Sequence, residues 1–327
     1  MSPDASSQAA LLDHPIVATL LARSRFPSAS SRVTCAVSGG PDSLALLVLA
    51  VAAGCEVTAV HVDHGLRPGS AAEADVVVAL AHALRAEVRC EQVVVAPGPN
   101  LEARARTARF RVLPRDVLTG HTMDDQAETV IVNLLRGSGL AGLAAMAPAR
   151  HPILGLRRAD THQLCQALHL VPVLDPSNDD LGFLRNRIRH QVLPLLDAAA
   201  KRDLVPLLAR QADLLRDEAD LLDALALAID PTDARALADA PVALARRAVR
   251  RWLTDEVRVY DPTGPTTGTR CVDASDGHDR SADLPVRTPP DAASVERVLT
   301  VARGDAVACE LPGGRRVVRR NQRLRLT

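Results

Sequence analysis

The sequence has very few aromatic residues and almost no lysine. Phe, Trp and Tyr together make up 2% of its 327 residues, so aliphatic side chains must fill the core, and 47% hydrophobic residues are enough for one. Lys201 is the only lysine, and no glycine-rich loop precedes it. Since the lysine of a Walker phosphate loop or of a Schiff base would have to be this residue, both chemistries are excluded.

Long apolar runs, a leader segment and paired cysteines are also lacking. The longest apolar run, residues 44–53, is about half as long as a membrane span. The N-terminus has no basic segment followed by an apolar one, so we expect neither a signal peptide nor a membrane partner. Six scattered cysteines without a Cys-x-x-Cys pair indicate reduced thiols in the cytoplasm, not a disulfide framework or a zinc knuckle. These are Cys35, Cys55, Cys90, Cys165, Cys271 and Cys309.

The chain has no excess of either charge, because 39 basic residues balance 39 acidic ones. This excludes a cationic field over the whole molecule, so any nucleic-acid contact must come from local basic patches. The length favours two domains, since a single core stops growing at about 250 residues.

The two parts of the chain differ in hydrophobic pattern. Up to about residue 190, short apolar runs alternate with helical periodicity, which predicts an α/β fold with a parallel sheet and crossover helices. We expect strands at residues 33–37, 56–61, 88–95 and 117–119, and helices at 43–53, 71–85, 101–113 and 124–135.

From about residue 201 to 253 only helical spacing is present, followed by a short helix at 293–302 and a hairpin of 306–311 with 315–318. Residues 255–290 are rich in Pro, Thr, Gly, Asp and Ser, which predicts a flexible insertion that buries too little surface to order itself. We therefore expect an N-terminal tail and helix (1–30), a parallel-sheet domain (31–199) and a smaller, mainly helical domain (200–327).

The strongest motif is Ser-Gly-Gly-Pro-Asp-Ser at residues 38–43, between a buried strand and a helix. The glycines let backbone N–H groups approach an anion, and the helix N-terminus adds its dipole. The hydroxyls of Ser38 and Ser43 can donate to phosphate oxygens. Asp42 would repel a phosphate unless a cation lay between them, so we expect Mg²⁺ at Asp42. An ordinary strand–turn–helix junction is the alternative.

Two further motifs follow predicted strands, at the carboxyl edge where α/β sheets bind ligands. The first, His-Val-Asp-His-Gly-Leu-Arg at 61–67, could instead be a zinc site of His61, Asp63 and His64, although no fourth ligand is evident. In the second, residues 120–129, Asp124 and Glu128 lie four apart on a helix and present clustered carboxylates. Such a cluster suits an ammonium group and could accept its proton, or it could merely stabilise the helix N-terminus.

Arginines form several clusters, and their guanidinium groups suit phosphates and a leaving pyrophosphate. Arg106 and Arg109 lie on one predicted helix, and residues 185–190 read Arg-Asn-Arg-Ile-Arg-His. In the C-terminal part, Arg246 and Arg250 are four apart, as are Arg247 and Arg251, and six arginines between 315 and 325 have no acid among them. Such patches neutralise RNA phosphates without reading sequence, although solvated faces are the alternative.

The Ser-Gly-Gly-x-Asp-Ser loop resembles the PP-loop of N-type ATP pyrophosphatases, which cleave ATP between the α- and β-phosphates and transfer AMP to a carbonyl oxygen. Four further segments resemble, in order, the motifs of tRNA(Ile)-lysidine synthases. They are 61–67, Glu102 to Phe110, 120–129, and Asp-Pro-Ser-Asn at 175–178 with Arg-Asn-x-Ile-Arg at 185–189. The resemblance covers residues 33–197. Phe110 replaces a tyrosine, and His151 stands where the family usually has an arginine that would contact phosphate or tRNA.

The resemblance implies a Rossmann-like PP-loop ATPase fold of the adenine nucleotide α-hydrolase type. It also implies which reaction the protein would catalyse. Free L-lysine would be ligated to C2 of the wobble cytidine of a CAU-anticodon tRNA(Ile), through an adenylated tRNA, with release of pyrophosphate and AMP. ATP and Mg²⁺ would be required. Members of the family are often dimeric, which leaves a homodimer as an alternative to a monomer.

The resemblance also implies roles for particular residues. ATP would bind Ser38, Gly39, Gly40, Pro41, Asp42, Ser43, His64, Gly65, Arg67, Gly120 and His121. Asp42, Asp125, Glu128, Arg106 and Arg189 would be catalytic, with Asp42 at the metal. Asp124, Asp125 and Glu128 would serve lysine or the metal, and Arg106, Arg109, Arg187 and Arg189 would steady phosphates or the adenylate. We expect tRNA to contact Arg109 and Arg187 and, because of the basic patches outside the resemblance, also Arg246, Arg250, Arg315, Arg316 and Arg319.

Three other functions fit parts of the sequence. A tRNA 2-thiolation enzyme of the same superfamily would need cysteines for sulfur relay or a cluster, and the cysteines here are unpaired in sequence. A nucleotide-binding module without catalysis would not need the acidic cluster or the basic tail. An amidotransferase ligase would need an ammonia-generating domain, for which the chain has no room.

Overall fold

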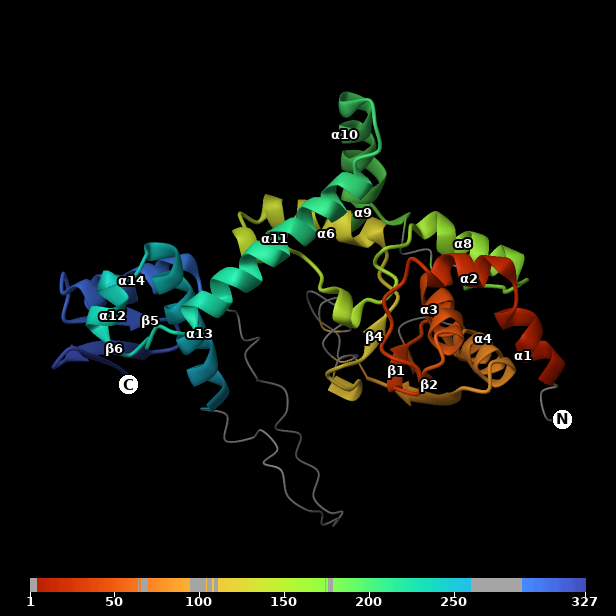
Figure 1. Ribbon diagram of the computed structural model, residues 1–327, viewed down its shortest axis with the longest axis horizontal. Helices are drawn as coiled ribbons and strands as arrows, with labels where there is room; N and C mark the ends of the chain where they lie inside the picture. The colour runs from red at the N-terminus through yellow and green to blue at the C-terminus, as the bar shows by residue number, and fades with distance from the viewer. Residues whose placement is uncertain are drawn as a thin grey trace, which may run out of the picture. The chain divides into compact units, whose positions relative to one another are not determined.

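The computed structural model describes residues 5–63, 65, 70–94, 104, 108, 111–173, 175, 179–259 and 290–327 (Figure 1). The chain divides into two compact units, Met1–Arg216 and Asp217–Thr327. This division lies within the long helix α11 (Val205–Ala226), whereas the division expected from the sequence lies at the end of α10 (Leu193–Ala200). Among the described residues, no helix is both long and apolar enough to cross a bilayer.

The first unit contains a sheet of four parallel strands in the order β3-β2-β1-β4, which confirms the predicted parallel α/β fold. The strands are β1 (Arg32–Ala36), β2 (Glu56–Asp63), β3 (Glu87–Gln92) and β4 (Leu118–Thr119). Ala36 at the end of β1 pairs with Val60 of β2 on one side and with Thr119 of β4 on the other. The strand order therefore reverses at β1, and open α/β sheets bind ligands at the carboxyl ends of strands at such a point.

Helix α3 (Pro41–Ala52) forms the centre of the core because it is apolar on nearly all sides. Every residue from Ser43 to Ala50 is buried, as expected of a helix covered by other elements. Figure 1 shows α2 (Pro15–Leu21) and α4 (Ser70–Ala83) beside it, and their apolar residues share its core. A smaller cluster of Val60, Leu113 and Val117 forms apart from this main core.

The remaining helices of this unit are short, except for two that contribute to the site. These two are α6 (Met123–Leu135) and α8 (Arg158–Ala167). The others are α1 (Ala5–Leu12), α7 (Leu140–Leu143), a 3₁₀ turn (Pro148–Arg150), α9 (Leu184–Arg187) and a π-helical turn (Ile188–Val192).

The second unit packs three helices on a small antiparallel sheet in the order β5-β6-β7 (Figure 1). The helices are α12 (Ala234–Asp239), α13 (Val242–Val259) and α14 (Ala292–Arg303), and the strands are β5 (Ala308–Leu311), β6 (Arg315–Arg320) and β7 (Arg323–Leu326). The predicted hairpin is present, but the interpretation missed β7, because its alternating arginines and leucines form only a short strand. The expected insertion also starts too early, since residues 255–259 belong to α13, and residues 260–289 lie outside the described residues.

Candidate active site

The turn between β1 and α3 has a conformation that requires glycine. Gly39 has a φ of +84°, and a Cβ there would lie 3.3 Å from the Cγ2 atom of Val173. The backbone N–H of Val173 donates to the Gly39 carbonyl at 3.0 Å, which fixes the turn from the other side. Gly40 then forms the N-cap of α3 and Pro41 its first residue. The turn therefore ends at a helix N-terminus, the usual place for an anion.

The two serines of this turn have different positions. The Ser43 hydroxyl is buried, donates to the Gly40 carbonyl at 2.9 Å and accepts from the backbone N–H of Ser38 at 3.1 Å. Ser38 itself is exposed, and its hydroxyl lies 3.3 Å from that of Ser43. Ser43 thus shapes the loop from inside, while Ser38 lies on its open side.

The turn after β4 lies directly against this loop. A Cβ on Gly120 would lie only 2.6 Å from the backbone oxygen of Asp42, so only glycine allows the approach. Beside it, the Thr119 hydroxyl lies 2.7 Å from Nδ1 of His121 and 2.6 Å from Nδ1 of His151. The two Nδ1 atoms lie 3.2 Å apart, so at least one of them must be unprotonated in order to accept.

Helix α6 begins with a capping interaction. The Oδ2 atom of Asp125 accepts hydrogen bonds from the backbone N–H and the hydroxyl of Thr122, at 2.8 and 2.9 Å. This is the reciprocal geometry of an N-terminal capping box. One oxygen of Asp125 therefore stabilises the helix N-terminus, which leaves Oδ1 for the site.

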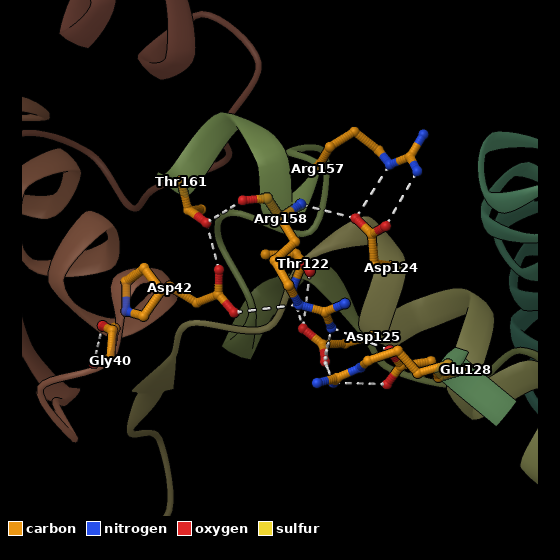
Figure 2. A network of polar contacts seen from close by, with 12 residues as sticks. Gly40, Asp42, Thr122, Asp124, Asp125, Glu128, Arg157, Arg158 and Thr161 are labelled. Carbon is orange, nitrogen blue, oxygen red and sulfur yellow. Dashed lines mark hydrogen bonds and ion pairs between the residues drawn. The ribbon is translucent and has the colours of Figure 1, made fainter. Parts of the chain in front are cut away.

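Asp125 and Glu128 face three guanidinium groups (Figure 2). Glu128, whose side chain is 1% exposed, accepts hydrogen bonds from Arg185 Nε and Arg189 Nε at 2.7 Å and from Arg158 Nη2 at 3.1 Å. Oδ1 of Asp125 accepts from Arg158 and Arg185, both at 3.1 Å. Burial alone would raise the pKa of Asp125, but Arg185 and Arg158 hold it well below its ordinary value. The ion pairs with three arginines offset the desolvation penalty of burying the carboxylates of Asp125 and Glu128.

Asp124 belongs to a different ion pair. Its carboxylate accepts two hydrogen bonds from Arg157, both at 3.1 Å, and one from the backbone N–H of Arg158 at 2.8 Å. Arg157 also pairs with Asp203. The three acids expected to form one cluster are thus divided, with Asp124 on Arg157 and the other two on the arginine cluster.

Asp42 lies in the first turn of α3 and faces α8. It belongs to the turn 38–43, here named the phosphate loop for its resemblance to a PP-loop. Its Oδ1 lies 2.5 Å from the Thr161 hydroxyl, and its Oδ2 lies 3.9 Å from Arg158 Nε (Figure 2). Burial and, second to it, the nearby charge of Asp125 together raise the pKa of Asp42 to about 6, although Thr161 and Arg158 act in the opposite direction. A carboxylate in this condition is stabilised by an added cation.

Asp42 fits a magnesium ion that is held mainly by phosphate oxygens and water. Mg²⁺ prefers oxygen ligands and commonly takes only one or two carboxylates from the protein. Within the part of the chain that the structure describes, no group of three or more His, Cys, Asp or Glu side chains could hold a metal by itself. The carboxylate of Asp42 is the one acid that belongs to the loop.

Arg158 joins the two halves of the site and was missed by the sequence interpretation, as was Arg157. Arg157 is the N-cap of α8 and Arg158 its first residue, and nothing in the sequence around this pair indicates which acids they contact. The interpretation also chose Arg187, which is exposed and donates to the carbonyls of residues 181 and 182. The spacing of Arg185 and Arg189, four residues apart, was a usable signal, because it places both on one helical face.

The motif at 61–67 and the helix expected at 101–113 are described only in part. His64, Arg67, Arg106 and Arg109 lie outside the described residues. Gly65 is exposed, has a φ of +59°, and donates from its backbone N–H to Asp63 at 2.8 Å. His61 is buried, and its Nδ1 lies 3.0 Å from the carbonyl of Val37, so it supports the strand end that leads into the phosphate loop.

The arginines of the C-terminal sheet divide between its two faces. Arg319 lies inward, where it hydrogen-bonds Gln322, and Arg315 lies on the same side as the buried Val317. The opposite face has four exposed arginines, namely Arg316, Arg320, Arg323 and Arg325. Two of these are paired with acids, Arg316 with Glu310 and Arg323 with Asp230. On α13, Arg246 and Arg250 are both exposed, and Arg246 pairs with Glu296.

Comparison with known proteins gives consistent relatives. A model of the PP-loop domain family matches residues 14–196. A Nocardia farcinica protein named tRNA(Ile)-lysidine synthase is 46% identical over 247 residues, which cover 70% of this chain and 78% of that protein. Proteins of the same name from Mycobacterium bovis and Thermobifida fusca are 43% and 42% identical, and the matches cover 69% and 68% of this chain and 76% of each relative.

A solved structure shares the fold at low sequence identity. The U34-tRNA thiolase NcsA from Methanococcus maripaludis, solved with its 4Fe-4S cluster, matches with a TM-score of 0.50 and 17% identity. The match covers 64% of this chain and 81% of that chain. At this identity the likeness concerns the fold alone.

Proposed function

The chain belongs to the tRNA(Ile)-lysidine synthase family of ATP-using ligases, and from this premise we propose that it ligates free L-lysine to the wobble cytidine of a CAU-anticodon tRNA(Ile). The O2 atom of the base attacks the α-phosphate of ATP, and pyrophosphate leaves. The lysine amine then attacks C2 and expels AMP. The first step is needed because a carbonyl oxygen is a poor leaving group, whereas AMP is a good one. The observation that best supports this is a phosphate loop beside a mixed arginine and carboxylate cluster.

The phosphate loop supplies the nucleotide site. The turn 38–43 and Gly120 lie in contact at the carboxyl ends of β1 and β4, so they would border the bound nucleotide. Backbone N–H groups at the start of α3 and the exposed Ser38 would bind the triphosphate. A Mg²⁺ ion at Asp42 would supply positive charge against the phosphates. Thr161 holds the Asp42 carboxylate in place from α8.

The arginine cluster would stabilise the charge that develops on the phosphates. Arg185 and Arg189 are fixed by Glu128, so they need little reorganisation when pyrophosphate leaves, and Arg158 lies between them and the loop. Arg106 would join them according to the family resemblance. The same two carboxylates, with Asp124 nearby, would receive the ammonium group of lysine and orient its amine.

The C-terminal sheet would bind tRNA through its phosphates. Arg320 of β6 and Arg325 of β7 are exposed on the outer face of the sheet, where their guanidiniums could contact phosphates. Arg246 and Arg250 of α13 would add contacts to the phosphates of the tRNA backbone. The wobble base itself would have to leave its stack to reach the site, as single-stranded loop bases commonly do.

Thiolation has less support than lysine transfer. Sulfur relay requires reactive thiolates. Burial raises the pKa of the Cys35 and Cys165 thiols to about 12, which makes thiolates unfavourable at both positions. Cys55 is buried as well.

The proposal predicts lysine-dependent labelling of tRNA. The protein is incubated with radiolabelled L-lysine, ATP, Mg²⁺ and unmodified tRNA(Ile) with a CAU anticodon. We expect label in the tRNA, with AMP and pyrophosphate released in equal amounts. A tRNA with uridine at the wobble position is the matched substrate control. Label-free tRNA(Ile), under conditions in which ATP binds, would refute the proposal.

The variant Asp42→Asn tests the proposed role of Asp42 in the same assay. It removes the charge beside the phosphate loop and keeps the shape of the side chain, so we expect pyrophosphate release to be lost while circular dichroism stays unchanged. Undiminished release would remove Asp42 from the proposed metal site.

A further inference from the structure

Arg158 is in an unusual position, because one guanidinium lies between the phosphate loop and the acidic pair. Its Nε lies 3.9 Å from Asp42 Oδ2, and its Nη2 lies 3.1 Å from both Asp125 Oδ1 and Glu128 Oε1 (Figure 2). No other arginine among the described residues has ion pairs with both the loop aspartate and the acids of α6. Arg158 thus contacts both places where substrates are proposed to bind.

The contacts of Arg158 to Glu128 are longer than those of its neighbours. Arg185 Nε and Arg189 Nε lie 2.7 Å from Glu128, whereas Arg158 Nη2 lies 3.1 Å away. A charge-assisted hydrogen bond is normally shorter than this, so Arg158 is held less closely by Glu128 than Arg185 and Arg189 are. It is also the one whose guanidinium reaches toward the loop.

The acidic pair leaves little opportunity for an ammonium group as it stands. Asp125 and Glu128 face the guanidiniums of Arg158, Arg185 and Arg189, and Arg158 also pairs with Asp42. These three acids and three arginines balance, so no net negative charge is left to attract an ammonium group. A lysine ammonium would also find the carboxylate oxygens already accepting hydrogen bonds.

We infer that Arg158 couples the two substrates by exchanging partners. Without nucleotide, its guanidinium neutralises Asp125 and Glu128 and closes the ammonium site. When a polyphosphate occupies the loop, Arg158 turns toward the phosphate oxygens and releases acceptor positions on both carboxylates. The inference rests on the function proposed above, since it takes the loop as the polyphosphate site and the acidic pair as the amine site.

The consequence is a defined order of events. Lysine binds well only after nucleotide is in place, so the amine enters once the group that will activate the base is already bound. Arg158 is a positioning residue in this scheme, because it controls when the carboxylates are available and forms no bond with lysine. Thermodynamic linkage also requires that lysine tighten nucleotide binding by the same factor.

The test is a binding cycle with the intact protein. L-lysine is titrated calorimetrically into the protein alone and into protein saturated with Mg²⁺ and α,β-methylene-ATP, which cannot be cleaved at the reacting bond. We expect lysine affinity to rise at least about tenfold with the analogue, within the usual range of coupling between sites, and the analogue to bind tighter with lysine by the same factor. Equal lysine affinities, or no lysine binding in the presence of the analogue, would overturn the inference.

Variants locate the coupling in one side chain. In Arg158→Gln the two lysine affinities should converge to within about twofold, mainly through tighter binding without nucleotide. Arg158→Lys retains a cation and should restore part of the difference. Arg32→Gln is the matched control, because Arg32 pairs with Glu56 at the start of β1, at the end of the strand away from the site, and coupling in this variant should stay as in the unaltered protein. Loss of coupling in Arg32→Gln but not in Arg158→Gln would contradict the assignment.

The tRNA-labelling assay separates this inference from the proposed function. If tRNA is labelled while lysine binds equally well with and without nucleotide, the ligase function stands and the role of Arg158 is wrong. If tRNA stays unlabelled, the function itself fails. The unaltered protein alone decides the coupling through the reciprocal titration, even if Arg158→Gln does not fold.

Discussion

At the scale of single residues, the site contains two buried carboxylates, Asp42 and Asp125, whose charges are compensated to different degrees. Asp125 is paired so completely that its pKa lies well below the ordinary value, whereas Asp42, with less compensation, has its pKa raised to about 6. The two acids belong to one network, yet they have opposite shifts because burial is outweighed by arginines at Asp125 and not at Asp42. Asp42 is therefore the acid that gains most from an added cation.

This difference predicts how stability depends on pH. A carboxyl whose pKa is raised on folding stabilises the protein below its unfolded pKa, near 3.8, and that contribution is lost as pH rises through about 6. The asparagine in the variant Asp42→Asn has no charge to bury, so raising the pH does not destabilise the variant in this way. The free energy of unfolding of the variant minus that of the unaltered protein should therefore rise by up to about 3 kcal/mol from pH 4 to pH 8. Denaturant unfolding at several pH values, without nucleotide or Mg²⁺, measures the difference.

Asp75→Asn serves as the control for removing a carboxylate, since Asp75 is exposed on α4. If the difference in free energy of unfolding between Asp42→Asn and the unaltered protein stays constant or shrinks as pH rises, burial of the charged Asp42 carboxylate does not destabilise the fold.

At the scale of elements, the site exists because two strand ends meet. β1 leads into the phosphate loop and β4 into Gly120, and their pairing at Ala36 and Thr119 brings the two turns into contact. The helix that follows each strand then has its N-terminus at the same edge of the sheet. Helix α8 completes the site from the side through Arg158 and Thr161.

The contact between the two turns predicts the effect of one added methyl group. In Gly120→Ala the new Cβ would start 2.6 Å from the Asp42 carbonyl oxygen, so the phosphate loop must move by about 1 Å, and such a shift can cost about a hundredfold in rate. We expect pyrophosphate release to fall by about ten- to a hundredfold with the fold retained.

Gly139→Ala is the matched control for Gly120→Ala, because a Cβ at Gly139 would have no neighbour within 4 Å and its φ is negative. Comparable activity of the two alanine variants would show that the loop tolerates displacement at Gly120.

At the scale of the whole molecule, charge is balanced overall and segregated locally. The 39 basic and 39 acidic residues cancel, yet four exposed arginines share one face of the C-terminal sheet. A balanced molecule has no long-range attraction for RNA, so binding must depend on short-range contacts with phosphates. Such contacts release counterions, which makes affinity depend on salt.

This segregation predicts the salt dependence of tRNA binding. Arg320→Gln with Arg325→Gln removes two charges from the outer face of the sheet, so the slope of log affinity against log salt should fall by about one to two units. Affinity should weaken for tRNA(Ile) and for unrelated tRNAs alike, because phosphate contacts read no sequence. Filter binding over a range of salt concentrations measures both effects.

Arg235→Gln with Arg303→Gln removes the same charge from exposed positions on α12 and α14 and is the control. An unchanged slope in the sheet variant, or the same change in the control, would assign tRNA binding to another surface.

The sequence by itself determined the features that depend on neighbouring residues. The strand–turn–helix of the phosphate loop follows from glycines and a helix start within six residues, and the acids of α6 follow from helical spacing. The predicted parallel sheet was right because short apolar runs mark β1 and β2, whereas β3 is polar and mostly exposed. The short β7 was missed, because a few alternating residues indicate a strand only when a partner strand is already present.

Only the tertiary structure decided which charges meet. Arg158 and Arg185 reach Asp125 across 33 and 60 residues of sequence, and no local pattern encodes such a pairing. The packing of α8 against α3 brings Arg158 to the acidic pair, and the turns at 184–192 bring Arg185 and Arg189. In the C-terminal sheet, register decides that Arg320 lies outward and Arg319 inward, since a shift of one residue exchanges the two faces of a strand.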